Sequence, residues 1–478
     1  MVNDAGQSKF RLMKLDDVCH VHCLGHVVDL HRLQATDPDR FPFLLQSLAG
    51  GGGLSRYDIL FAYPQQSLVL HSLSALRGPF AAGQTDFLAA LERWYLSQRC
   101  DTDGSTGPLF SGGWFVYLGY ELAQQIEPTL RLPPSADRFP LAFATRCPAA
   151  LIVDRIAGKT WLVCEPEYGD CMAPLQQAAA RSRHAAPEPV TRRLLVDSLR
   201  EEAAEQFLEG VASIRDFIRE GDVFQVNLSR QWLARPRPGV SAEQIYAQLC
   251  RYNPAPFAAL VYWQEHALLS SSPERLVSCR DGQVQTRPIA GTRPRAESRS
   301  ADQGFAAELM AHPKERAEHV MLVDLERNDL GRVCVPGSIH VDEFLTLETY
   351  AHVHHIVSNI SGRLQPGLTP VDLIRAVFPG GTITGCPKIR CMEIIAQLEQ
   401  AGRGFYTGSI GYLDRRGDLD LNILIRSLLV GPGQVSLRAG AGIVHDSEPE
   451  RELHETRSKA RGMLQALCDA DGWPGVRS

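Results

Sequence analysis

The chain has 478 residues, of which 44% are hydrophobic and 22% charged, the profile of a folded globular protein. Its formal net charge of −6 provides no basic excess for binding nucleic acid or an anionic membrane surface. No apolar run approaches the roughly 20 residues needed to cross a bilayer, and residues 1–17 lack the apolar core of a signal peptide. We therefore expect a cytoplasmic protein, with its 12 scattered cysteines reduced.

Residues 1–185 are predicted to form a sheet-rich region. Short strand-like runs over 58–62 and 149–153 are separated by glycine-rich breaks. The proline-containing, basic stretch 182–193 is the best linker candidate, which leaves a second region over 195–470.

Cys19, His20, His22 and Cys23 are residue types that bind zinc. Alternating side chains on a strand point to opposite faces, whereas a tetrahedral site needs its ligands to converge. We therefore do not expect zinc there.

In the second region, helical spacing predicts a helix over 200–219 that ends at Gly221. Strands are expected over 223–232, 258–263 and 267–270, and helices over 301–325, 370–378 and 387–400, the last with Pro387 as its first helical residue. This alternation indicates a mixed α/β or α+β architecture.

Two pairs of glutamates have helical i, i+3 spacing. Glu315 and Glu318 share a face of the helix expected to begin near Ser300, and Glu452 and Glu455 repeat the spacing near the C-terminus. Carboxylates on two helices would suit an octahedral Mg²⁺ ion. By spacing alone, such pairs are more often solvated helix faces.

Two glycine-rich segments could bind an anion. Residues 378–388 present backbone N–H groups to an anion, but they lack the spacing of a nucleotide P-loop. Residues 439–443 follow a strand, and their glycines allow either the close approach of a ligand carboxylate or the close packing of a neighbouring strand. Arg426 lies in an apolar run, so it needs an anionic partner, either a structural carboxylate or a ligand. Tyr406 could donate a hydrogen bond or fill the core.

Three histidines occupy one strand-like run. Alternation places His352 and His354 on one face and His355 on the other, which excludes a three-histidine metal site on a regular strand. A single proton-transferring histidine is the better hypothesis.

Several long motifs occur in a fixed order between residues 200 and 467: GDVFQVNLSR (221–230), SPERL (272–276), RPIAGTRPR (287–295), KERAEHVMLVDLERNDLGR (314–332), 378–388, GSIGYL (408–413) and 438–456. In these motifs the chain resembles the chorismate-utilising enzymes: anthranilate, aminodeoxychorismate, isochorismate and salicylate synthases. The resemblance implies their α+β fold of two sheets with peripheral helices.

The resemblance also implies roles for individual residues. Glu318 and Glu455 match Mg²⁺ ligands, with Glu315 and Glu452 as water-mediated partners, and the ion would hold the ring carboxylate of chorismate. The positions matching substrate contacts are Arg426 and Tyr406, for the enolpyruvyl carboxylate, with Gly440, Thr382 and Lys459. Glu274 matches the acid that protonates the departing 4-hydroxyl, and His355 the histidine beside the ring.

Two further positions bear on the reaction. Isochorismate and salicylate synthases carry a water-activating lysine where this chain has Gln225, which favours ammonia as the attacking group. Many aminodeoxychorismate synthases carry a nucleophilic lysine where this chain has Ala290, the form usual in anthranilate synthases. With Ala290, ammonia would have to attack the ring directly.

The QVNL motif at 225–228 and the LLQS motif at 44–47 resemble aminodeoxychorismate synthases. The resemblance therefore predicts component I of that enzyme, which makes 4-amino-4-deoxychorismate for folate biosynthesis from chorismate and ammonia supplied by a glutamine amidotransferase subunit. The alternatives are anthranilate synthase component I and an inactive chorismate-binding regulatory subunit. Whether a tryptophan binds near residues 44–47 is left open by the sequence.

Overall fold

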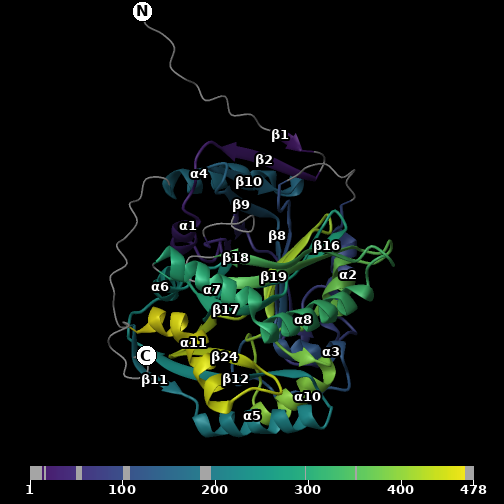
Figure 1. Cartoon of the computed structure of the whole chain (residues 1–478). Helices are drawn as coiled ribbons and strands as arrows, with labels where there is room; N and C mark the ends of the chain where they lie inside the picture. Colours follow the sequence, from purple (N-terminus) through teal and green to yellow (C-terminus); the bar gives the residue numbers. More distant parts are fainter. Residues whose placement is uncertain are drawn as a thin grey trace, which may run out of the picture.

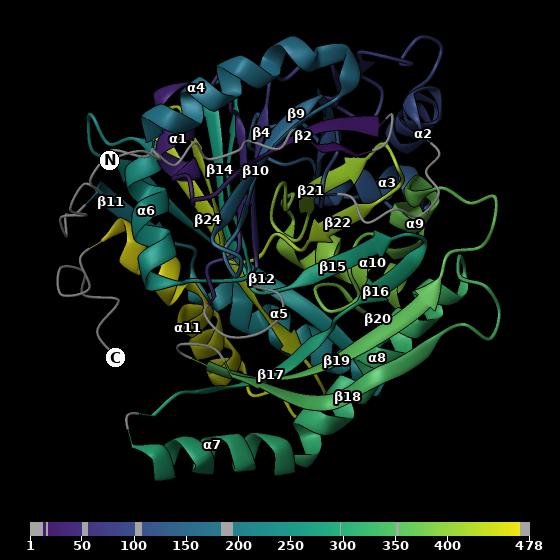
Figure 2. The ribbon, with the colours of Figure 1, turned by 90° about the horizontal axis from the view of Figure 1, so that it is seen from above.

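The computed structural model describes residues 13–15, 18–49, 56–100, 108–182, 195–296, 298–349 and 353–468. Two large antiparallel sheets face each other, and helices cover their outer surfaces (Figure 1). The α+β class expected from the sequence is confirmed, and Figure 2 shows the same arrangement from above.

The first sheet contains 13 strands within the described residues. In spatial order they are β1 (Met13–Leu15), β2 (Cys19–Leu24), β10 (Lys159–Cys164), β9 (Ala149–Asp154), β4 (Tyr57–Ala62), β3 (Phe43–Gln46), β13 (Phe257–Trp263), β14 (His266–Ser272), β23 (Ser427–Gly431), β24 (Gln434–Ile443), β12 (Gln225–Pro236) and β11 (Val196–Glu201), with β20 (Gly385–Cys386) paired to β12.

The second sheet contains 11 strands within the described residues. Their order is β17 (Ile289–Pro294), β19 (Val353–Arg363), β16 (Gln283–Thr286), β15 (Arg275–Arg280), β22 (Leu419–Asn422), β21 (Ser409–Asp414), β7 (Gly113–Leu118), β8 (Ala142–Cys147), β5 (Ser67–Leu70) and β6 (Leu76–Arg77), with β18 (His340–Thr349) paired to β19.

The helices that matter for the site follow the strands of the second half of the chain. They are α5 (Ala204–Arg219), α6 (Ala242–Tyr252), α7 (Arg299–Ala311), α8 (Pro313–Gly331), α9 (Pro370–Val377), α10 (Lys388–Glu399) and α11 (Pro449–Leu467). The first half contributes α1 (Leu30–Thr36), α2 (Phe87–Gln98), α3 (Ala123–Ile126) and α4 (Met172–Ser182).

Aromatic side chains fill the space between the two sheets. Phe43 on β3 stacks on Phe115 of β7 with ring centroids 4.2 Å apart, and Phe143 on β8 stacks on Trp263 of β13 at 3.9 Å. Burying rings of this size contributes about 1.5–3 kcal/mol each. Strands from both halves of the chain meet in each sheet, since β3 pairs with β13 and β7 with β21.

Several of the expected elements differ in their boundaries. The helix expected over 301–325 is two helices, because Pro313 interrupts the first and starts α8. Residues 196–201 form β11, so α5 begins only at Ala204. Pro387 is the N-cap of α10 rather than its first helical residue, and residues 439–443 lie within β24 rather than after it.

No helix in the described part of the chain is long and apolar enough to span a membrane.

Candidate active site

The predicted site residues gather where the two sheets meet the helices of the second half. β12 and β24 form the floor, and α11 packs on β24 while α8 packs on β17 and β19 (Figure 2). The glycine-rich loop 378–384 leads into β20, which pairs with the start of β12. Residues from motifs more than 200 positions apart are thereby brought together.

Glu274 lies just after β14 and is 5% exposed. Burial raises the pKa of its carboxyl to about 7, although the nearby Thr382 hydroxyl and the Lys459 ammonium lower it. Oε1 of Glu274 accepts no hydrogen bond of ordinary geometry from any described residue, nor does the Thr382 hydroxyl form one. A carboxyl that is protonated near neutral pH and has an open oxygen is suited to general acid catalysis.

The acidic residues proposed as metal ligands lie on two helices, Glu315 and Glu318 on α8 and Glu452 and Glu455 on α11. Burial raises the pKa of Glu318, the negative charges of Glu315 and Glu455 raise it further, and a hydrogen bond from Nε2 of Gln225 lowers it. Glu452 is buried and Glu455 is exposed, with Nζ of Lys459 2.6 Å from Oε1 of Glu455.

This donor set fits a hard divalent cation, because all four groups are carboxylates and the charge of Glu318 is repelled by two of the others. Two of these carboxylates also form ion pairs within the protein. Nη1 of Arg293 lies 3.2 Å from Oε1 of Glu315, and Lys459 pairs with Glu455. Within the described ranges, no three His, Cys, Asp or Glu side chains are close enough together to hold a metal ion. The four glutamates would therefore have to draw together around Mg²⁺.

Arg426, Tyr406 and Gly440 lie together, as the resemblance implied. Arg426 sits between β22 and β23 with a φ of 54°, and it donates a hydrogen bond to the carbonyl of Lys459. Among the described residues no carboxylate forms an ion pair with Arg426, although the charge of Glu455 acts on its guanidinium. A Cβ on Gly440 would come within 2.9 Å of the Tyr406 hydroxyl, so glycine is required there.

His355 is 8% exposed on β19, and burial lowers its pKa to about 4. Its Nδ1 lies 3.3 Å from the carbonyl of Gly291, so Nδ1 donates and the ring is neutral at pH 7. Ala290 is buried on the neighbouring strand β17. His354 points to the other face, with Nε2 3.0 Å from Asp302, as alternation predicts, while His352 lies outside the described residues.

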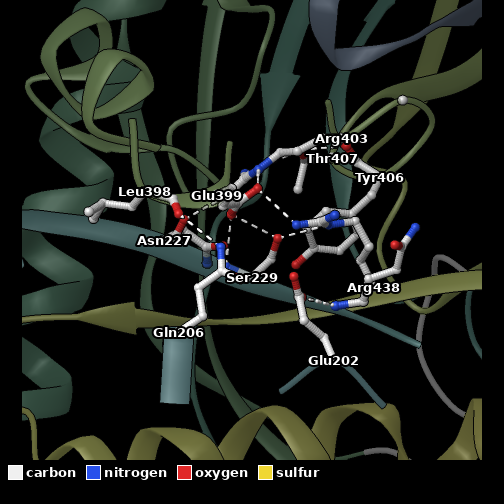
Figure 3. A network of polar contacts seen from close by, with 12 residues as sticks. Glu202, Gln206, Asn227, Ser229, Leu398, Glu399, Arg403, Tyr406, Thr407 and Arg438 are labelled. Atoms are coloured by element: carbon white, nitrogen blue, oxygen red, sulfur yellow. Dashed lines mark hydrogen bonds and ion pairs between the residues drawn. The ribbon is translucent and has the colours of Figure 1, made fainter. Parts of the chain in front are cut away.

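Beside Tyr406 and the 378–384 loop lies a buried network centred on Glu399 (Figure 3). Glu399 accepts hydrogen bonds from Ser229, Arg403 and Arg438, all at 2.7–3.1 Å. Arg403 also donates to the carbonyls of Ile383 at 3.0 Å and Asn227 at 2.7 Å, and its guanidinium lies 5.6 Å from the ring of Tyr406. One cation thus ties the 378–384 loop, β12 and Tyr406 to each other.

Sequence reasoning missed three buried acids of this region. Glu399 anchors the network, and Glu121 of the first half accepts hydrogen bonds from the backbone N–H groups of Arg403 and Gly404. Glu326 is buried on α8. The signal for Glu326 was available, because it interrupts a helical stripe whose other members, His319, Leu322, Val323 and Leu330, are buried.

A cavity of about 350 Å³ lies between the two sheets, lined by residues from both halves of the chain. Its lining includes Leu45, Gln46 and Ser47 of the LLQS motif, together with Arg56 and Arg275. Gln46 accepts a hydrogen bond from the Tyr246 hydroxyl, and the backbone of Ser47 donates to Asp58.

Comparison with known proteins agrees with this geometry. A family model described as "chorismate binding enzyme" matches residues 45–465. An "anthranilate synthase component I-like protein" of Synechocystis sp. is 45% identical over 365 residues (75% of this chain, 73% of the relative), and aminodeoxychorismate synthase component 1 of Bacillus subtilis is 41% identical over 396 (80% and 82%). The crystal structure of anthranilate synthase component I from Streptococcus pneumoniae superimposes with a TM-score of 0.76 at 31% identity, covering 86% of this chain and 93% of that one.

The chain therefore belongs to the chorismate binding enzyme family, and it is a chorismate-utilising synthase. Its relatives include both anthranilate and aminodeoxychorismate synthases, so similarity alone leaves the product undefined.

Proposed function

We propose that the chain is component I of aminodeoxychorismate synthase and converts chorismate and ammonia to 4-amino-4-deoxychorismate and water. The observation that carries the proposal is the Glu274 carboxyl, which is buried, has a pKa of about 7 and leaves Oε1 open to a leaving hydroxyl. Glu274 donates a proton to the 4-hydroxyl as the carbon–oxygen bond breaks, while ammonia forms the carbon–nitrogen bond and releases a proton.

The other side chains bind and orient chorismate. The Arg426 guanidinium and the Tyr406 hydroxyl, beside the backbone of Gly440, hold the enolpyruvyl carboxylate. Glu318 and Glu455, with Glu315 and Glu452, would hold Mg²⁺, which supplies a positive charge for the ring carboxylate. Thr382 and Lys459 contact the substrate on the side of Glu274.

Ammonia is the nucleophile in this proposal because Gln225 and Ala290 occupy the two positions at which related enzymes carry a reactive lysine. Gln225 donates its Nε2 hydrogen to Glu318 over 2.8 Å and has no basic group to activate water. Ala290 cannot form a covalent adduct, so amination is direct. Ammonia comes from a glutamine amidotransferase subunit, in keeping with the "component 1" relatives.

Anthranilate synthase is the second candidate. It is favoured by Ala290 and by a 37% identical anthranilate synthase component 1 from Synechocystis sp. that aligns over 89% of this chain. The neutral His355 beside the Ala290 strand could take the proton whose removal accompanies pyruvate loss.

One experiment separates the two candidates. The purified chain is incubated with chorismate, Mg²⁺ and ammonium, with and without aminodeoxychorismate lyase. 4-Aminobenzoate that forms only with the lyase supports our proposal, and fluorescent anthranilate without the lyase supports the alternative. Absence of both products under these conditions would point to an inactive binding subunit.

The cavity between the sheets supports a further proposal, that a tryptophan occupies the N-terminal region. Leu45 and Ile59 offer apolar contacts, and the cavity is lined at its polar side by Gln46, Ser47 and Asp420. Denaturing the purified protein and chromatographing the released small molecules tests this, since tryptophan should appear in a near one-to-one ratio with the chain.

A further inference from the structure

The start of β12 carries two buried amides on one face of the strand. Gln225 and Asn227 are two residues apart, so their side chains leave the strand on the same side. They are only 3% and 9% exposed. Oε1 of Gln225 and Oδ1 of Asn227 accept no hydrogen bond from any residue that the structure describes. Because buried amide oxygens are normally satisfied, two open ones in a candidate active site indicate a ligand that donates hydrogen bonds.

Both amides are held in place by their neighbours. Nε2 of Gln225 donates to Oε1 of Glu318 over 2.8 Å, and only the amide nitrogen can donate to a carboxylate, so Oε1 is the open atom of Gln225. The backbone carbonyl of Asn227 accepts a hydrogen bond from Arg403 at 2.7 Å. The two open oxygens therefore belong to side chains whose positions are fixed by other groups.

The neighbouring strand β24 has glycine beside both amides. Asn227 lies opposite Gly442 in the pairing of the two strands, and Gly440 follows two residues away on the same face. A Cβ on Gly442 would come within 2.4 Å of Nε2 of Gln225, and one on Gly440 within 2.8 Å of Oδ1 of Asn227. The two amides thus lean over bare backbone, and neither glycine places a side chain between them and the site.

The amides also lie between the two ends of the proposed chorismate site. The Cβ on Gly442 would be 3.5 Å from Oε1 of Glu318, a proposed metal ligand, and the Cβ on Gly440 would be 2.9 Å from the Tyr406 hydroxyl. In the proposed function the ring carboxylate binds at the Glu318 end and the enolpyruvyl carboxylate at the Tyr406 end. A ring held at both ends would pass in front of Gln225 and Asn227.

We propose that Oε1 of Gln225 and Oδ1 of Asn227 bind the attacking ammonia. The inference rests on the proposed function, in which ammonia is the nucleophile, and it applies to both candidate products. Ammonia donates two N–H hydrogens to the two oxygens, which leaves its lone pair free to face the ring. As the carbon–nitrogen bond forms, the carbon–oxygen bond breaks, the leaving hydroxyl takes the proton of Glu274, and the new amino group releases one proton.

Amide oxygens suit ammonia better than carboxylates would. The ammonium ion has no lone pair and cannot attack, and a carboxylate in contact with it would stabilise this charged form. Neutral oxygens accept N–H hydrogens with a weaker preference for the ion. The carboxylate of Glu318 is close by, but its Oε1 already accepts the hydrogen bond from Gln225.

Replacing Asn227 with leucine tests the proposal, because leucine has nearly the same size and no acceptor. The assay uses the full chain with ammonium as the nitrogen source, at one fixed pH and at saturating chorismate and Mg²⁺. N227L should raise the KM for ammonium about tenfold, through the loss of one buried hydrogen bond, with no change in the KM for chorismate. N227A, which only removes atoms, should give a similar rise. N227D should keep a low KM for ammonium but lose kcat, because its carboxylate holds the protonated ion.

Q231L is the matched control. Gln231 is an amide further along β12 that lies opposite Arg438 instead of a glycine, so both KM values should stay at the wild-type level. A wild-type KM for ammonium in N227L and N227A, or a rise in the KM for chorismate of equal or greater size, would overturn the ammonia site and leave the proposed function standing. A wild-type chain that cannot aminate chorismate with ammonium would overturn the proposed function and this inference together.

Discussion

Nε2 of Gln225 donates a hydrogen bond to Oε1 of Glu318 over 2.8 Å. Gln225 stands where water-adding relatives carry a lysine, and here it holds the side chain of a proposed metal ligand in place. This hydrogen bond lowers the pKa of Glu318 against the opposing effects of burial and of Glu315 and Glu455.

Replacing Gln225 with leucine should therefore weaken Mg²⁺ binding near neutral pH. Without its donor, Glu318 holds a proton to higher pH, and the ion must displace that proton. Isothermal titration with Mg²⁺ should show an apparent Kd about tenfold higher at pH 6.5, with recovery toward pH 8.5. Q283L, an exposed position on β16, is the control, and an unchanged Kd in Q225L would contradict a metal site at Glu318.

Glu274→Gln should lower kcat by about 100-fold or more with little change in KM, because the variant loses its transferable proton. In the wild-type protein the acid must be protonated, and its pKa is about 7. The kcat/KM of wild type should therefore be constant below that pH and fall as the pH rises through about 7. A wild-type profile that is flat up to pH 9 would exclude Glu274 as the acid.

The same substitution should stabilise the fold at alkaline pH. The pKa of Glu274 rises from 4.5 to about 7 on folding, so the wild-type protein loses stability as the pH rises from 4.5 to 7. Above pH 7 E274Q should be more stable by on the order of 3 kcal/mol, and at pH 4 the difference should vanish. Urea unfolding of wild type and E274Q at pH 5 and pH 8 measures this difference. Equal free energies of unfolding for the two proteins at pH 8 would show that burial does not raise the pKa of the Glu274 carboxyl.

Glu399→Gln should be strongly destabilising, because it leaves Arg403 and Arg438 buried without their shared carboxylate. We expect a loss of about 3–5 kcal/mol in the free energy of unfolding. The KM for chorismate should rise as well, since Arg403 fixes both Tyr406 and the 378–384 loop. E393Q removes the exposed Arg390–Glu393 pair from the same helix and should cost less than about 1 kcal/mol.

Gly440→Ala should impair chorismate binding, because the added methyl group would lie 2.7 Å from the carbonyl of Leu228 and 2.9 Å from the Tyr406 hydroxyl. We expect KM to rise about tenfold as Tyr406 is displaced. Gly304→Ala on α7 has open space around it and should be neutral or slightly stabilising. Equal KM values for the two variants would remove Gly440 from the substrate site.

Local patterns predicted most elements of the second half, because strands such as β13 and helices such as α9 combine regular apolar spacing with clear ends. The prediction of one continuous helix over 301–325 was wrong, because the chain breaks before Pro313 and a second helix starts there. Pairing between strands could not be predicted, because the order of strands in a sheet depends on contacts between residues far apart in the chain.

For the site, long motifs predicted Arg426, Tyr406 and Gly440 as neighbours, and the structure places them together. They could not identify Glu399 or Glu121, whose partners are backbone groups and arginines from other motifs. The sequence around Arg403 contains no pattern that predicts its simultaneous contacts with β12 and the 378–384 loop. Such contacts exist only after the sheets have formed.

The shared sheets also determine when the molecule can become stable during synthesis. β3, near residue 45, pairs with β13, near residue 260, and the floor of the site joins β12 to β24, which ends at residue 443. Strand pairings between residues this far apart in sequence form slowly, because the entropy cost of closing a long loop comes before any favourable contact is made. A nascent chain halted near residue 185 would expose the edge of β3 and the aromatic rings beneath it. The ribosome must therefore deliver almost the whole polypeptide before the apolar interior is closed to solvent, and until then the exposed apolar surface is prone to aggregate.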